Sequence, residues 1–76
     1  MLGYIYSLVR SFEKEHGFHP NLLYINSIHN KHLTSSFADG YSMQQIMNIL
    51  GMEIIVDQEI IHPRVAWTHT AFRTAS

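Results

Sequence analysis

Apolar residues recur at intervals of three and four along the first sixteen positions, which is the spacing of an amphipathic helix. The expected core face of this helix consists of Leu2, Ile5, Leu8, Val9 and Phe12. Gly17 follows the polar end of the segment and suits the left-handed conformation that closes many helices. Pro20 then prevents the helix from resuming. The pattern predicts a helix over residues 2–16.

Three later segments have the length and composition of strands. Residues 21–26 (NLLYIN) are a short apolar run typical of a buried strand, and residues 53–57 (EIIVD) are rich in β-branched side chains. Residues 64–70 alternate, with Val65, Trp67 and His69 on one side. The sequence therefore predicts three strands.

The last two predicted strands are separated by residues 58–63, a connection too short for a parallel crossover. We therefore expect them to pair antiparallel. Trp67 is expected to face the core with His69 beside it, because a small domain gains most from burying its largest side chain. The alternative is that Trp67 faces outward and anchors a dimer.

Two further helices are predicted between the first and second strands. Asn26 or Ser27 can cap a short helix over residues 28–37, whose inward side chains are expected to be Ile28, Leu33 and Phe37. Residues 38–40 (ADG) form a turn signal. Ser42 and Gln45 have the spacing of a capping box and begin a second helix that runs to about Leu50.

Gly51 is the predicted stop of this second helix, with Met52 closing the apolar contact that often accompanies such a cap. The apolar stripe of the helix consists of Met43, Ile46, Met47 and Leu50. We interpret Met43, Met47 and Met52 as core residues, with a plastic binding groove as the alternative.

The predicted order is helix, strand, helix, helix, strand, strand, which is an α+β class. Two or three helices should pack on one face of a small mixed sheet of about three strands. Residues 1–76 are expected to form a single domain, with residues 71–76 as a frayed tail.

Composition narrows the possible partners. Charged residues make up only 14% of the chain, so part of the surface is expected to be covered by another protein or by a second copy. The five Lys and Arg residues are scattered, which argues against nucleic acid and against an anionic membrane surface. The chain has no cysteine, no signal-peptide pattern and no apolar run of about 20 residues, so a cytoplasmic location is expected.

Six histidines are the one compositional excess. His16 and His19, like His29 and His32, are three residues apart, and two histidines on one helical face could chelate a divalent ion such as Zn²⁺. Such a site would need further ligands, for which the nearby candidates are Asp39, Glu13 and His69. The alternative is that these are polar surface histidines and that the protein holds no cofactor.

The sequence contains no catalytic signature, and no catalytic residue is assigned. Ser35, Ser36 and Asp39 lie near histidines, but no nucleophile-elbow glycines surround them. A small enzyme subunit remains a hypothesis. Its base would be His62 or His69, beside Asp57 or Glu59.

Two stretches carry a resemblance to a known fold. The run GFHPNLLYINSIHNKHL (residues 17–33) and the later run ILGMEIIV (residues 49–56) resemble a segment of the tailed-phage major capsid fold. That resemblance implies a helix, a strand ending in Asn, a short helix and a later Leu-Gly-hydrophobic strand. The chain departs from it at Glu53, where that fold usually has Pro. The chain also resembles small bacterial α/β domains, from which no activity is carried over.

The leading hypothesis is a non-enzymatic interaction module or accessory subunit that self-associates, with a homodimer as the simplest form. It rests on the low charge and on aromatic side chains in excess of what the core requires. These are Tyr4, Tyr6, Tyr24, Tyr41 and Trp67. A His-based metal-binding protein is the second hypothesis, and the small enzyme subunit is the third.

Overall fold

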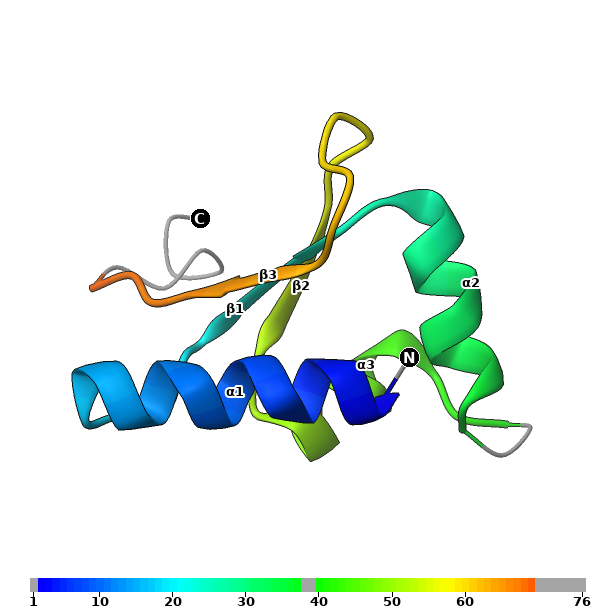
Figure 1. Cartoon of the computed structure of the whole chain (residues 1–76). Coiled ribbons are helices and arrows are strands. Elements are labelled where there is room, and N and C mark those ends of the chain that lie inside the picture. The colour runs from blue at the N-terminus through cyan, green and yellow to red at the C-terminus, as the bar shows by residue number, and fades with distance from the viewer. Residues whose placement is uncertain (1, 38–39, 70–76) are drawn as a thin grey trace.

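The structure is a computed structural model that describes residues 2–37 and 40–69. The described residues form three helices and three strands (Figure 1): α1 (Leu2–His16), β1 (Leu22–Ile25), α2 (Ser27–Ser35), α3 (Met43–Leu50), β2 (Glu53–Val56) and β3 (Arg64–Ala66). This order and the α+β class confirm the prediction from sequence. The predicted tail at 71–76 and most of the predicted turn at 38–40 lie outside the described residues.

The three strands form a mixed sheet in the order β2-β1-β3. β1 is parallel to β2, with Leu23 beside Ile54, and antiparallel to β3, with Leu23 beside Val65. The predicted antiparallel pair of the last two strands is therefore wrong, since β1 lies between them. The chain leaves β2, crosses the end of β1 and returns along its far side.

Two asparagines that flank β1 explain how the chain makes this crossing. Asn26 follows β1, and its Nδ2 donates at 3.1 Å to the carbonyl oxygen of Ile60. Ile60 belongs to residues 57–63, the crossing loop, which joins β2 to β3. Asn21 precedes β1, and its side chain both donates to the Thr68 carbonyl and accepts from the Thr68 N–H, each at 3.0 Å. Hydrogen bonds from residues that flank the central strand β1 thus hold the chain both before and after β3.

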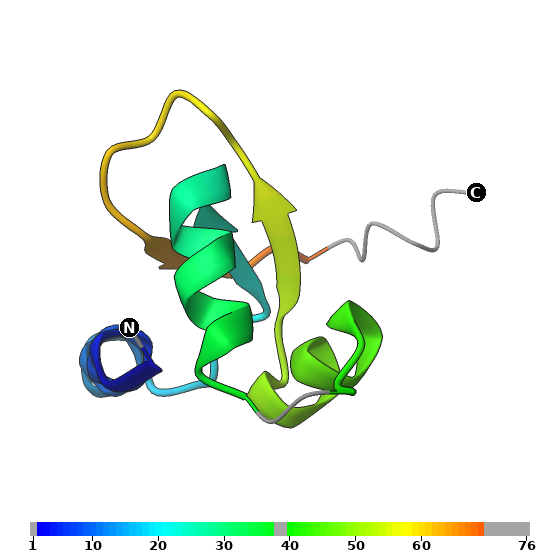
Figure 2. The ribbon, with the colours of Figure 1, turned by 90° about the vertical axis from the view of Figure 1, so that its right-hand side faces the viewer.

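Helices cover one face of the sheet. Side chains of α1, α2 and α3 join Leu23 and Ile25 of β1 in one buried cluster, whose helical members are Ile5, Val9, Leu33, Ile46 and Leu50. In Figure 2, which looks along α1, α2 lies in front of the strands, with α1 below them on the left and α3 below them on the right. None of the helices in the described part of the chain is both long enough and apolar enough for a transmembrane span.

One predicted core residue of α2 is exposed. Leu33 is fully buried, but Ile28 is 64% exposed, so the inward assignment of Ile28 is wrong. At about 100° per residue, five positions place Ile28 roughly 140° around the helix from Leu33. Its side chain therefore points away from the sheet.

The ends of α3 have the predicted geometry. The Ser42 hydroxyl accepts from the Gln45 N–H at 3.2 Å, and the Gln45 side chain accepts from the Ser42 N–H at 2.8 Å. Gly51 closes the helix in the left-handed region with φ 72°, and Met52 beyond it is buried. Gly17 closes α1 in the same way with φ 82°. These local predictions are confirmed.

Candidate functional site

The first predicted histidine pair lies at the end of α1, and both rings make contacts of their own. His16 Nε2 is 3.5 Å from Glu15 Oε1, and the ring centroid lies 4.2 Å from that of Phe12. His19 Nδ1 is 3.0 Å from Glu13 Oε2, while its Nε2 is 3.2 Å from the carbonyl oxygen of Leu50. His19 therefore links the end of α1 to the end of α3.

The second pair lies on α2, at the other end of the molecule (Figure 1). His29 Nδ1 accepts from the Asn26 N–H at 3.2 Å and completes the capping box of that helix. His32 is exposed, and its carbonyl oxygen accepts from the hydroxyls of Ser35 and Ser36 at 3.0 Å each. Across residues 2–37 and 40–69, no three His, Asp or Glu side chains come together as a group that could hold a metal ion.

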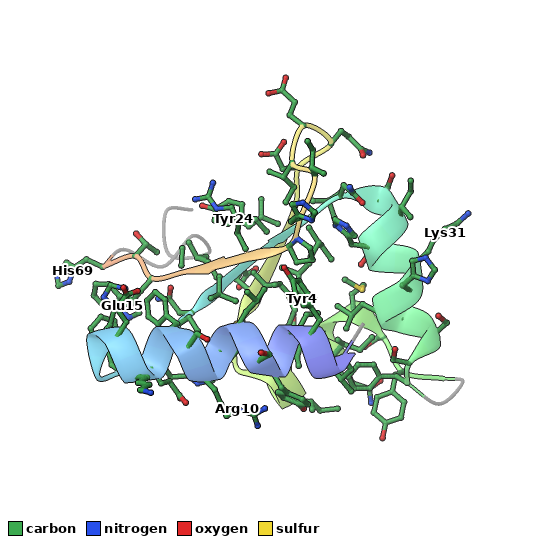
Figure 3. The ribbon with its side chains drawn as sticks, viewed as in Figure 1. Tyr4, Arg10, Glu15, Tyr24, Lys31 and His69 are labelled. Carbon is green, nitrogen blue, oxygen red and sulfur yellow. The ribbon has the colours of Figure 1, made fainter. Side chains whose placement is uncertain are left out.

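Of the two histidines considered for acid–base chemistry, His62 lies in the same connection between β2 and β3 as Asp57 and Glu59, whereas His69 does not. Asp57 Oδ1 accepts from the Glu59 N–H at 3.0 Å in the turn after β2. That turn precedes the N-terminal end of β3, whereas His69 lies beyond the C-terminal end of β3, toward the end of α1 in Figure 3. The structure therefore does not place His69 beside Asp57 or Glu59. Figure 3 shows the crossing loop that carries those two residues projecting away from α1.

Five rings form a continuous series at the end of α1, which we call the aromatic row: Phe12, His16, Phe18, Trp67 and His69. Phe18 is central, with its ring centroid 5.7 Å from Phe12, 6.0 Å from His16 and 5.4 Å from Trp67. Trp67 in turn lies 5.8 Å from His69. Rings from two distant parts of the sequence thus meet on one surface.

The aromatic row overturns the inward assignment of Trp67. β3 ends at Ala66, so Trp67 leaves the sheet and is 44% exposed, while Phe18 is 46% exposed. His69 is exposed as well. The inward prediction assumed that alternation continued to residue 70. The ladder between β1 and β3 ends at Ala66, and beyond it the N–H and the carbonyl of Thr68 hydrogen-bond to the side chain of Asn21.

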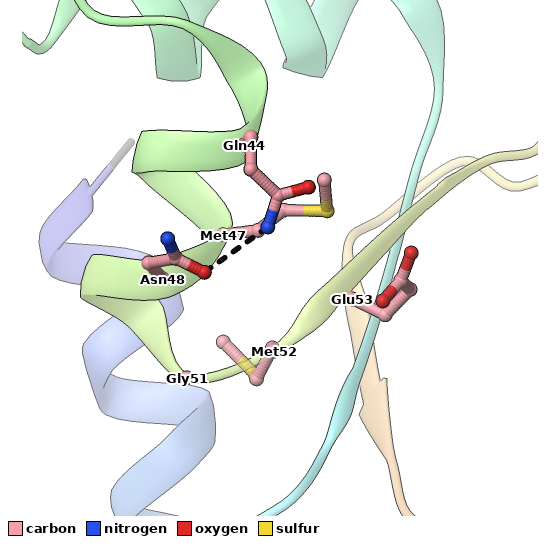
Figure 4. A pocket seen from close by; sticks show the side chains of 6 residues that line it. All are labelled: Gln44, Met47, Asn48, Gly51, Met52 and Glu53. Carbon is pink, nitrogen blue, oxygen red and sulfur yellow. Dashed lines mark hydrogen bonds between the residues drawn. The ribbon is translucent and has the colours of Figure 1, made fainter. Parts of the chain in front are cut away.

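A second feature is an open hollow of about 490 Å³ between α3 and the start of β2 (Figure 4). Its lining residues are Gln44, Met47, Asn48, Gly51, Met52 and Glu53. Gln44 Nε2 donates to Asn48 Oδ1 at 3.1 Å, which holds the two amides together on the helix. Met52 is buried as predicted for a core residue, whereas Met47 is half-buried and faces the hollow.

Comparison of the chain with protein-family models, with curated proteins and with solved structures found no match.

Proposed function

We propose that this chain is a non-enzymatic protein-interaction module that self-associates through the aromatic row. The observation that carries the proposal is that Phe18 and Trp67 touch each other and yet are each nearly half exposed. Large aromatic side chains in contact on a surface are the residues that interface centres favour. An accessory subunit that pairs with a different chain would use the same surface.

Low charge supports the proposal. Charged residues make up 14% of the chain, and the described surface also exposes Tyr4, Tyr6 and Tyr41. A lone small domain keeps apolar patches small and charges plentiful, because both favour solubility. The absence of cysteine supports a cytoplasmic place for the module, where small domains fold without disulfides.

The energy available suggests a weak dimer. Each ring is nearly half exposed, so burying Phe18 and Trp67 on two copies removes roughly 400 Å² of apolar surface, worth about 10 kcal/mol at 25 cal/mol per Å². Association itself costs about 4–15 kcal/mol. The two terms are similar, so the dimer should be weak and should form only at high protein concentration.

Sedimentation velocity across the micromolar to millimolar range tests this. The parent chain should shift from monomer to dimer, and Trp67→Ser or Phe18→Ser should move the midpoint to higher concentration. Tyr41→Ser is the matched control, because Tyr41 is 47% exposed but touches Phe37 rather than the aromatic row. A strictly monomeric parent at every concentration would end the proposal of self-association. An equal effect of all three substitutions would remove the aromatic row as its site.

A further inference from the structure

The outer edge of β2 is the feature that carries a new inference. β2 is an edge strand, since the sheet order places only β1 beside it. The N–H of Glu53 donates to the Asn21 carbonyl at 2.9 Å, and the N–H of Asp57 donates to the Ile25 carbonyl at 2.7 Å. Backbone groups alternate in direction along a strand. The residues between these anchors that have the opposite direction, Ile54 and Val56, therefore turn their N–H groups away from β1.

The outward N–H of Ile54 has an unusual acceptor. It donates to the thioether Sδ of Met47 on α3 at 3.3 Å. Figure 4 shows the Met47 side chain reaching from α3 toward the strand. A thioether is a weak acceptor and a methionine side chain is flexible, so a peptide carbonyl is the better partner for this group. Met47 therefore occupies a position that an incoming strand could take over.

Space and apolar surface adjoin this edge. The open hollow of about 490 Å³ lies against the start of β2 and is lined in part by Met47 and Met52. At the other end of the strand, Val56 is 47% exposed. An extended segment laid along the edge would place side chains over the hollow and over Val56.

The charged side chains carried by β2 and the turn after it are all acidic. No Lys or Arg occurs between Lys31 and Arg64, whereas three of the six acidic residues lie on β2 and in the turn after it: Glu53, Asp57 and Glu59. By alternation Glu53 and Asp57 project from the same face of the sheet. Glu53 is also engaged within the chain. The edge strand thus combines outward backbone groups with acidic side chains.

We propose that the outer edge of β2 binds an extended basic segment of another protein, which adds a fourth strand to the sheet. The segment has basic side chains opposite Glu53 and Asp57 and three apolar or β-branched residues between them. This order reads the same in both directions, so it suits a parallel or an antiparallel strand. Edge pairing of this kind takes affinity from main-chain hydrogen bonds and specificity from alternate side chains.

A second copy fits the same edge less well. Pairing Ile54 with Val56 of an antiparallel copy satisfies the outward groups of both strands, but it sets Glu53 directly opposite Asp57 of that copy. Like charges directly opposite are destabilising in a sheet. The aromatic row lies beside α1 and β3, at the other edge of the sheet from β2, so the two proposed surfaces are independent.

Titration of the whole chain with end-blocked Lys-Val-Thr-Val-Lys, followed by amide NMR, tests the proposal. The amides of Ile54 and Val56 should shift and exchange with solvent more slowly as the peptide is added. The matched peptide Glu-Val-Thr-Val-Glu should bind about tenfold more weakly, since attraction becomes repulsion at two cross-strand pairs. A copy of the basic peptide that is N-methylated on its three central residues should lose binding, because it keeps the charges but not the backbone donors.

Val56→Pro should also abolish binding, because it removes one of the two outward N–H groups. The variant should still fold, since proline is tolerated on an edge where its missing N–H faced solvent. Val56→Thr, which keeps the donor and the β-branched shape, should bind as the parent does. Equal binding of the N-methylated peptide would overturn the proposal by showing charge attraction alone. Protection of the Ile54 amide that rises with protein concentration and without peptide would overturn it in favour of a second copy. Because Trp67→Ser should leave peptide binding unchanged, failure of self-association and failure of peptide binding are separate results.

Discussion

Replacing Gly51 by alanine should destabilise the chain more than the same replacement at Gly17. Both glycines close a helix at positive φ, 72° at Gly51 and 82° at Gly17. A Cβ at Gly17 would meet nothing within 4 Å, whereas a Cβ at Gly51 would lie 3.3 Å from His19 Nε2. The two positions therefore share the backbone strain and differ in the crowding by one ring.

The expected magnitudes follow from these contacts. A side chain in the left-handed region costs roughly 1–2 kcal/mol, and this is the whole expected loss for Gly17→Ala. At Gly51 the His19 ring must also move. This movement breaks the hydrogen bond between its Nε2 and the Leu50 carbonyl oxygen, which are 3.2 Å apart. Losing that hydrogen bond adds about 0.5–1.5 kcal/mol. Gly51→Ala should therefore lower the free energy of unfolding by about 1.5–3.5 kcal/mol.

Urea unfolding of both variants, in the parent and in a His19→Ala background, separates the cost of backbone strain from the cost of crowding by the His19 ring. Without the ring, the two alanine substitutions should become equal in their effect on the free energy of unfolding. The reasoning is refuted if Gly51→Ala is no worse than Gly17→Ala in the parent. It is equally refuted if the difference persists after His19 has been removed. A changed slope with urea in either variant would mark an altered denatured state instead.

Further predictions concern burial and the side chains that cap and tie the strands. Ile46→Ala should cost about 2–5 kcal/mol in urea unfolding, because Ile46 is 1% exposed, whereas Ile49→Ala, at a site 51% exposed, should cost under about 1 kcal/mol. Asn21→Ala removes both hydrogen bonds to the Thr68 backbone and should cost about 1–3 kcal/mol. If the unfolding midpoint stays unchanged, Asn21 is not what holds the end of β3. Asn26→Ala should cost about 1–2 kcal/mol and speed amide exchange in the first turn of α2, because Asn26 accepts from the His29 N–H at 2.9 Å.

The sequence was a reliable guide where the determining contacts are local. The capping box at Ser42 and Gln45 and the left-handed glycine at 51 depend on residues within one turn of each other. The order of the strands depends instead on contacts between distant segments. The short connection after β2 suggested a hairpin, but the Asn26 side chain holds Ile60 across the end of β1.

One signal in the sequence did point to the correct sheet order. Leu22, Leu23 and Ile25 are all under 5% exposed, and a strand buried on both faces reads as a continuous apolar run. The run in residues 21–26 has that form, whereas residues 53–57 and 64–66 contain charges. A central position for the first strand follows from that contrast. The aromatic row had no such signal, because Phe18 and Trp67 meet only once β3 lies against β1.

The placement of β1 between two strands that come later in the chain also bears on how the protein folds. Leu22 pairs with both Glu53 and Ala66, so each ladder closes a loop of roughly 30 to 45 residues, and no two adjacent strands are joined by a tight turn. Contacts so distant in sequence slow the search for the native state. During synthesis, β1 would emerge before both of its partner strands, as an unpaired apolar segment. Its sheet would stay incomplete until residues 64–66 had left the ribosome.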